Sequence, residues 1–186
     1  MNRGVLLSCV LAVGFFHFGP PAEASTFRPI PLAKMVEASS LVVVATPVSR
    51  ETHWAMTGSM ARVVTDVTLE VAWTLRGNDS TGQDIVVRTL GGTVGDVGQI
   101  VYGEARLVLG QSCLFFLMVG RDGAYHVLGM AQGQYPLEPD NEGDWRVNAS
   151  PGLEGVLEPQ ISVVGALLGR RLMDIPNLLE SPEFAL

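Results

Sequence analysis

Two histidines, His53 and His126, are the residues best suited to chemistry in this chain, because imidazole serves both as a metal ligand and as a general base. His53 stands beside Trp54 in a polar stretch, whereas His126 alternates with apolar residues in a predicted strand. A zinc site needs several ligands that converge on one ion. Two histidines in such different settings do not make a recognisable ligand pattern, so the sequence predicts no metal and no cofactor.

An acidic segment, 138–144, carries Asp140, Glu142 and Asp144 at alternate positions. Carboxylates at this spacing are typical of calcium loops, but the glutamate that an EF-hand needs at its twelfth position is replaced by Pro151. A solvated hairpin tip explains the same charges. The sequence leaves calcium binding at this segment open.

Motifs for nucleophilic catalysis and for phosphate binding are missing from the sequence. It contains no Gly-x-Ser-x-Gly nucleophile elbow. The glycine-rich segment 91–98 lacks the Gly-Lys-Ser/Thr end of a P-loop. Cys113 lies in an apolar run with no charged or imidazole neighbour that would lower its thiol pKa, so it is expected to be a core residue. These observations favour a protein that is not an enzyme.

The elements that must position these residues are mostly strands. Apolar and polar residues alternate over 63–74, which places Val63, Val67 and Trp73 on one face of a long strand. Predicted strands are 41–48, 63–74, 84–90, 113–119, 124–132, 134–137 and 144–148; predicted helices are 29–39 and 161–173. Closely spaced strands predict a mainly β fold, a small closed or partly open Greek-key barrel of the OB type with short flanking helices. Segments 50–61 and 91–111 are expected to be loops.

The N-terminal segment 1–24 has the features of a signal peptide. A short basic start precedes the uncharged, mostly apolar stretch 4–18, and Ala22-Glu23-Ala24 offers small residues for cleavage before Ser25. We therefore expect export to the periplasm or beyond the cell, with no stable membrane span after cleavage; a membrane anchor and a lipoprotein cut at Cys9 are the alternatives. Residues 25–150 would form the barrel domain, and 151–186 a linker, a short helix and a loose tail.

The amino-acid composition bears on which kind of partner the protein binds and on the kind of organism that encodes it. With 19 acidic and 12 basic residues the chain has a net charge of −7, which argues against nucleic acid as a partner. Lys34 is the only lysine, an arginine bias that is typical of a GC-rich bacterium and indicates a bacterial origin. Together with the predicted signal peptide, this makes a bacterial envelope protein the expectation.

The strand rhythm resembles that of a known superfamily. It runs from Leu41-Val-Val-Val-Ala-Thr-Pro-Val, through Thr65-Asp-Val-Thr-Leu-Glu-Val and Val86-Val-Arg before a glycine pair, to Leu114-Phe-Phe-Leu. This order, over about residues 38–133, resembles exported bacterial domains of uncharacterised role, and through them the OB-like barrel of the netrin and tissue-inhibitor-of-metalloproteinase superfamily. Those inhibitors chelate a metal through an N-terminal cysteine, whereas Ser25 is expected here. The resemblance therefore implies the fold and not protease inhibition.

Together these features predict an exported, non-enzymatic module that binds a protein or a glycan through segments 50–61 and 91–106. The candidate contact residues are Trp54, Met56, Gln99, Tyr102, Glu104 and Arg106. One alternative is an exported hydrolase that pairs His53 or His126 with a carboxylate such as Asp66, Glu70 or Asp96; it requires an imidazole within hydrogen-bond reach of a carboxylate or nucleophile in a cleft. A second alternative is a purely structural envelope protein.

Overall fold

The computed structural model describes residues 28–153 and 162–181, so the predicted signal peptide and most of the predicted linker lie outside the described residues. The strands are β1 (Leu41–Thr57), β2 (Met60–Arg76), β3 (Asp84–Leu90), β4 (Gly92–Val94), β5 (Val97–Gln99), β6 (Cys113–Val119), β7 (Tyr125–Val127), β8 (Gln134–Pro139) and β9 (Trp145–Val147). The helices are α1 (Leu32–Ala38), α2 (Val163–Leu167) and α3 (Ile175–Glu180), with 3-10 turns η1 (Met130–Gly133), η2 (Pro151–Leu153) and η3 (Leu172–Asp174).

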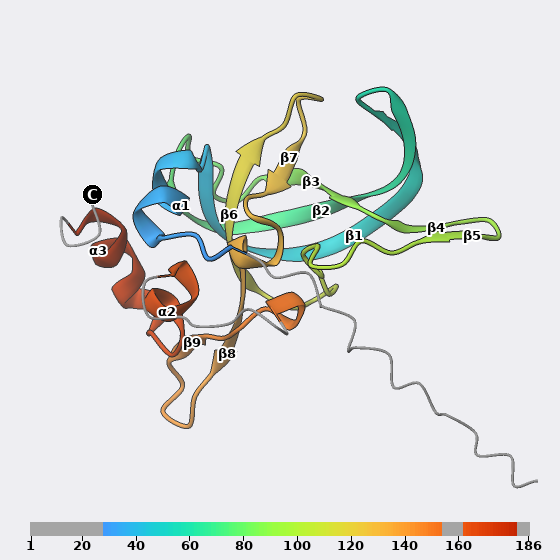
Figure 1. Cartoon of the computed structure of the whole chain (residues 1–186). Helices are drawn as coiled ribbons and strands as arrows, with labels where there is room; N and C mark the ends of the chain where they lie inside the picture. The colour runs from blue at the N-terminus through green and yellow to red at the C-terminus, as the bar shows by residue number, and fades with distance from the viewer. Residues whose placement is uncertain (1–27, 154–161, 182–186) are drawn as a thin grey trace, which may run out of the picture.

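Five strands form a ring in the order β1-β2-β3-β7-β6, which the pairing of β1 with β6 closes. The contacts are antiparallel except that between β3 and β7, which is parallel and has the single register pair Val87–Tyr125. β8 and β9 continue the sheet beyond β6. This order is that of an OB-type Greek-key barrel. Helices α1, α2 and α3 flank one side of the barrel (Figure 1). The ring of strands and the short flanking helices together confirm the predicted fold class.

Two hydrophobic clusters share the walls of this barrel. The first fills the barrel interior and includes Val43, Cys113 and Phe115. The second lies between the outside of β1, β6 and β8 and the helices, and includes Val42 and Phe116. β1 and β6 therefore bury both faces where they pair, which explains why their sequences are continuous apolar runs rather than alternating ones.

The predicted loop 50–61 is wrong, because these residues form the outer half of the long β1–β2 hairpin. Both strands have 17 residues and pair from Val42–Arg76 to Thr57–Met60. The register shifts between Pro47 and Ser49, and proline is found in strands at bulges or edges because it lacks the N–H that a strand ladder needs.

The predicted inward position of Trp73 is also wrong. Consecutive β1 residues, Val44 and Ala45, pair with Trp73 and Val71, so Ala72 is an extra residue on β2. A bulge of this kind reverses the alternation of the side chains beyond it. Trp73 is therefore 41% exposed instead of buried with Val71.

Two further predicted elements differ from the structure. The predicted strand 124–132 ends at Val127, since Gly129 adopts a left-handed conformation (φ 68°) that leads into η1. The predicted helix 161–173 is divided, because the chain turns at Gly169 (φ 73°) after α2. The segment beyond Asp174 forms α3 and buries Ile175 completely, so within the described residues it is not a loose tail. No helix in the described ranges is long and apolar enough to cross a membrane.

Candidate functional site

The two segments predicted to bind a partner form two hairpins that project from the barrel on the side opposite the helices (Figure 1). One is the outer half of β1 and β2, and the other is the β4–β5 hairpin with the chain that follows it. We call the exposed side chains of residues 54–60 and 97–102 the two-hairpin surface.

The β4–β5 hairpin is fixed to the middle of the β1–β2 hairpin. The Gln99 side-chain carbonyl accepts a hydrogen bond from the backbone N–H of Val63 (3.1 Å), and the Gly91 N–H donates to the Val63 carbonyl (2.8 Å). A Cβ at Gly92, which has a φ of 130°, would lie 2.6 Å from side-chain atoms of both Thr52 and Thr65. Only glycine allows this approach. The predicted loop 91–111 is thus wrong over its first part, which forms the paired strands β4 and β5, and its glycine pair holds the two hairpins together.

The two-hairpin surface is apolar and exposed. Ile100 and Tyr102 are 79% and 80% exposed, and Trp54 is 50% exposed. Met56 and Met60 flank the tip of the β1–β2 hairpin and are also exposed. Of these five, Met60 and Ile100 were not singled out from the sequence, because a hydrophobic residue next to a turn is as easily buried as exposed.

A cleft of about 700 Å³ opens beside this surface, between the inner barrel wall and segment 99–109. Three of the six predicted contact residues, Gln99, Glu104 and Arg106, line it. The other three do not: Trp54 and Met56 lie on β1, and Tyr102 is exposed to solvent. The structure therefore divides the predicted site into a polar cleft and an adjoining apolar surface.

Glu104 is the acidic group in this cleft. Its carboxylate accepts hydrogen bonds from the backbone N–H groups of Leu90 (3.3 Å) and Ala105 (3.1 Å). Burial raises the pKa of Glu104 above its ordinary value, since these bonds and the neighbouring His126 only partly offset the desolvation of the charge. Within the described ranges, no lysine or arginine forms an ion pair with it.

A row of charged groups crosses β1, β2, β3 and β7, which the sequence did not reveal as a unit. Arg88 binds Asp66 through two hydrogen bonds of 2.7 Å and reaches Asp122 at 3.1 Å. His126 lies 3.0 Å from Asp122, and His53 lies 3.7 Å from Asp66. The hydrogen bonds from Arg88 hold the pKa of Asp66 below its usual range. Only the strand register, which pairs Asp66 with Arg88, brings these residues together.

We expect Asp66→Asn to lower the free energy of unfolding by about 1 kcal/mol at pH 7, because it replaces a charge-assisted pair that is partly exposed. A lowered pKa in the folded state stabilises the protein above about pH 4, and this contribution is lost as the pH falls through the folded value. The difference between variant and wild type should therefore be smaller at pH 2 than at pH 7. Urea denaturation at both pH values measures it.

Asp96→Asn is the control for this prediction, since Asp96 is exposed in the turn between β4 and β5. It should change stability little at either pH. A loss in Asp66→Asn that is the same at pH 7 and pH 2 would contradict the role given to the Asp66 charge.

The hydrolase alternative meets its geometric requirement only in part. His126 has a carboxylate within 3.0 Å, but Asp122 also binds Arg88, and neither histidine lines the cleft that holds Glu104. No serine, threonine or cysteine of the described residues hydrogen-bonds to either imidazole. The carboxylates named from sequence as partners were Asp66, Glu70 and Asp96, and of these only Asp66 lies near a histidine in an ion pair.

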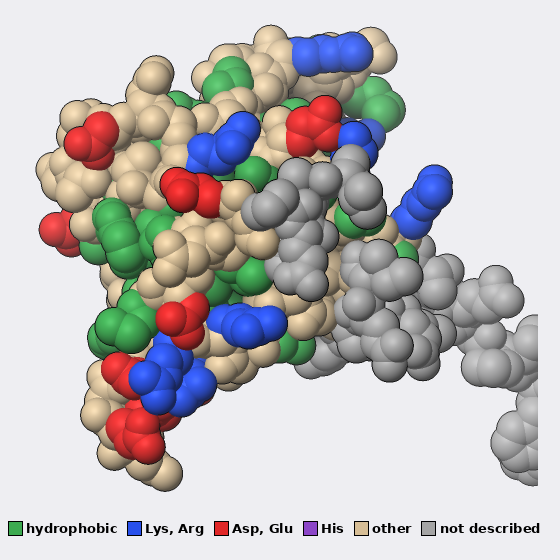
Figure 2. All heavy atoms as spheres, turned by 90° about the vertical axis from the view of Figure 1, so that its left-hand side faces the viewer, with side chains coloured by type: hydrophobic (Ala, Val, Ile, Leu, Met, Phe, Trp, Pro, Cys, Tyr) green, Lys and Arg blue, Asp and Glu red, His purple; other side chains and the backbone are tan. Residues whose placement is uncertain are grey.

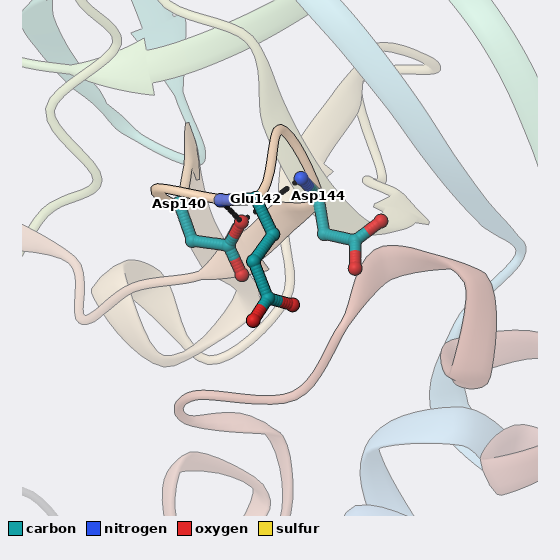
Figure 3. Close-up of side chains that lie close together, drawn as sticks. All are labelled: Asp140, Glu142 and Asp144. Carbon is teal, nitrogen blue, oxygen red and sulfur yellow. Dashed lines mark hydrogen bonds between the residues drawn. The ribbon is translucent and has the colours of Figure 1, made fainter.

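The acidic segment 138–144 stabilises the β8–β9 hairpin in which it lies. Figure 3 shows the Asp140 carboxylate turned back to the N–H groups of Glu142 (2.9 Å) and Asp144 (3.0 Å). Arg146 binds the other Asp140 oxygen (2.8 Å), and Arg171 binds Asp144 (3.1 Å) and Glu142 (3.5 Å). The carboxylate oxygens lie within 4.8 Å of one another, and Arg146 and Arg171 offset two of the three negative charges. The cluster therefore ties the β8–β9 hairpin to the segment before η3.

Comparisons with known proteins assign no family to this chain. No family model matches the sequence, and no curated protein matches it significantly.

Proposed function

We propose that this chain is an exported, non-enzymatic binding module whose ligand is another protein. It binds that protein through the two-hairpin surface, with the cleft of Glu104 as a neighbouring polar contact. The observation that carries the proposal is the group of exposed apolar side chains on two hairpins that are fixed to each other. Exposed patches of this kind mark interaction sites in soluble proteins.

The chemistry of the surface favours a protein partner. Trp and Tyr are enriched among residues that dominate protein interfaces, and methionine adapts its shape to the surface that it meets. Trp54 and Tyr102 supply the rigid aromatic contacts here, and Met56 and Met60 the adaptable ones. Because Gln99 and the glycine pair fix the hairpins before binding, little conformational entropy is lost on association.

Glu104 adds electrostatic selectivity to this surface. Its carboxylate is largely desolvated and makes no ion pair with a described lysine or arginine. A partner that inserts a lysine or a chain amine into the cleft would supply the missing countercharge. The net charge of −7 also favours association with a basic partner.

Site-specific photo-crosslinking tests the proposal. Benzoylphenylalanine replaces Met56, which is exposed on the β1–β2 hairpin, and the full chain is expressed in its native host. Irradiation should give a discrete covalent adduct with one protein outside the cytoplasm. Trp54→Ser and Tyr102→Ser should each reduce the adduct at least tenfold, whereas Val86→Ser, at an exposed position of β3, should not.

Two results would count against this function. A set of adducts that Trp54→Ser and Val86→Ser change equally would show that the surface has no defined partner. Cell fractionation of the same strain tests export separately, and a chain that keeps residues 1–24 and stays in the cytoplasm would contradict it.

A further inference from the structure

A second, smaller pocket lies where β2, the β8–β9 hairpin and the segment of η3 meet. Its volume is about 180 Å³, and it is lined by Trp73, Asp144, Trp145, Arg171, Leu172 and Met173. None of these residues belongs to the two-hairpin surface or to the lining of the Glu104 cleft. The pocket is therefore separate from the site proposed above. In Figure 2, acidic and basic side chains lie together at the lower edge of the face that carries the helices.

Two of the three tryptophans in the chain meet in this pocket without being buried there. Trp73 is 41% exposed and Trp145 is 46% exposed. Each is held on a paired strand, since Trp73 pairs with Val44 and Trp145 with Pro139. Strand positions fix the indoles more precisely than loop positions would, so the pocket is lined by two indoles that the sheet holds in place.

The rim of the pocket is polar and balanced in charge. Arg171 binds Asp144 at 3.1 Å, and its backbone bridges to Arg146, which fixes it beside the hairpin. A carboxylate can accept more hydrogen bonds than this ion pair uses, and a guanidinium can donate more. The rim thus offers fixed donors and acceptors next to the indoles.

The two indoles and the Asp144–Arg171 pair together favour some classes of ligand over others. A cation attracted to the indoles would meet Arg171, and an anion would meet Asp144. A wholly apolar ligand would desolvate the Asp144–Arg171 pair without replacing its contacts with water. A sugar ring has an apolar C–H face for an indole and hydroxyl groups for the rim. The volume is below the range usual for drug-sized ligands and fits a single ring.

We propose that this pocket is a binding subsite for one neutral pyranose unit of a glycan. The sugar stacks on the indoles of Trp73 and Trp145, and its hydroxyl groups hydrogen-bond to Asp144 and Arg171.

Isothermal titration of the full-length protein with neutral oligosaccharides tests the subsite, and the probes are tetramers of N-acetylglucosamine, glucose and mannose. At least one should bind. Trp73→Ala and Trp145→Ala should each weaken that binding at least tenfold, while Trp145→Phe, which keeps an aromatic face, should weaken it less. Trp54→Ala is the matched control, because the third tryptophan lies on the two-hairpin surface, and it should leave affinity unchanged.

Several outcomes would overturn the subsite. These are failure of all three tetramers to bind, binding that Trp145→Ala leaves intact, and an equal loss in Trp54→Ala. Tighter binding of heparin tetrasaccharide or of tetramethylammonium would overturn the neutral sugar assignment. Thermal unfolding of each variant confirms that it is folded. The crosslinked adduct with the protein partner should form in Trp145→Ala as in wild type. The sugar subsite and the protein-binding surface can therefore fail independently of each other.

Discussion

Gly133→Ala is expected to lower the free energy of unfolding by about 3 kcal/mol, because it inserts a methyl group where the backbone leaves no room. A Cβ at this position would lie 2.2 Å from the Leu128 carbonyl oxygen and 3.1 Å from the Phe116 carbonyl oxygen. Those two residues are joined by a hydrogen bond from the Leu128 N–H to the Phe116 carbonyl (2.8 Å). The extra methyl group must push η1 away from β6, and both obstacles are backbone atoms that cannot rotate aside.

Gly98→Ala is the matched control for this substitution. Its added Cβ would meet only the Thr93 hydroxyl, at an ordinary contact distance of 3.8 Å. The change should stay within about 0.5 kcal/mol of wild type. Urea denaturation of both variants measures the difference, and equal stability of the two would contradict the close approach at Gly133.

Ile175→Ala is expected to destabilise the protein by about 2–5 kcal/mol, as other truncations of fully buried side chains do. Ile175 is 0% exposed and belongs to the cluster between the helices and the barrel, together with Leu167 of α2 and Val44 of β1. The loss would show that the C-terminal helices stabilise the barrel and are not an appendage.

Met173→Ala serves as the control for Ile175→Ala, since Met173 is 62% exposed two residues earlier in the same segment. It should lower the thermal midpoint by no more than about 2 °C, whereas Ile175→Ala should lower it by about 5–20 °C. A similar small shift in both variants would mean that α3 adds little to the core.

The barrel could be predicted because its strands carry the periodicities that burial imposes. β3 and β6 coincide with the predicted strands 84–90 and 113–119, the first alternating and the second apolar on both faces. The outer half of the β1–β2 hairpin gave no such signal. From Val48 to Thr57 no β1 side chain is buried, so no face is selected to be apolar and the segment was interpreted as a loop.

The candidate site was harder to predict than the fold. Gln99, Glu104 and Arg106 were found because a long glycine-rich connection favours function, and they do line one cleft. The row that contains Asp66, Arg88 and Asp122 depends on pairings between residues far apart in sequence, and no local pattern encodes such register. The Trp73–Trp145 pocket was missed for a related reason, because a single bulge residue turned Trp73 outward.

The parallel contact between β3 and β7 has the fewest paired residues of any strand contact in the barrel ring. One residue pair joins the strands there, and the Arg88–Asp122 ion pair bridges the same gap from β3 to the turn before β7. This ion pair therefore joins β3 to the segment of β7 where few backbone hydrogen bonds do so. Salt screens a partly exposed ion pair, and acid neutralises its carboxylate. High ionic strength or low pH would therefore separate β3 from β7 before the rest of the fold unfolds.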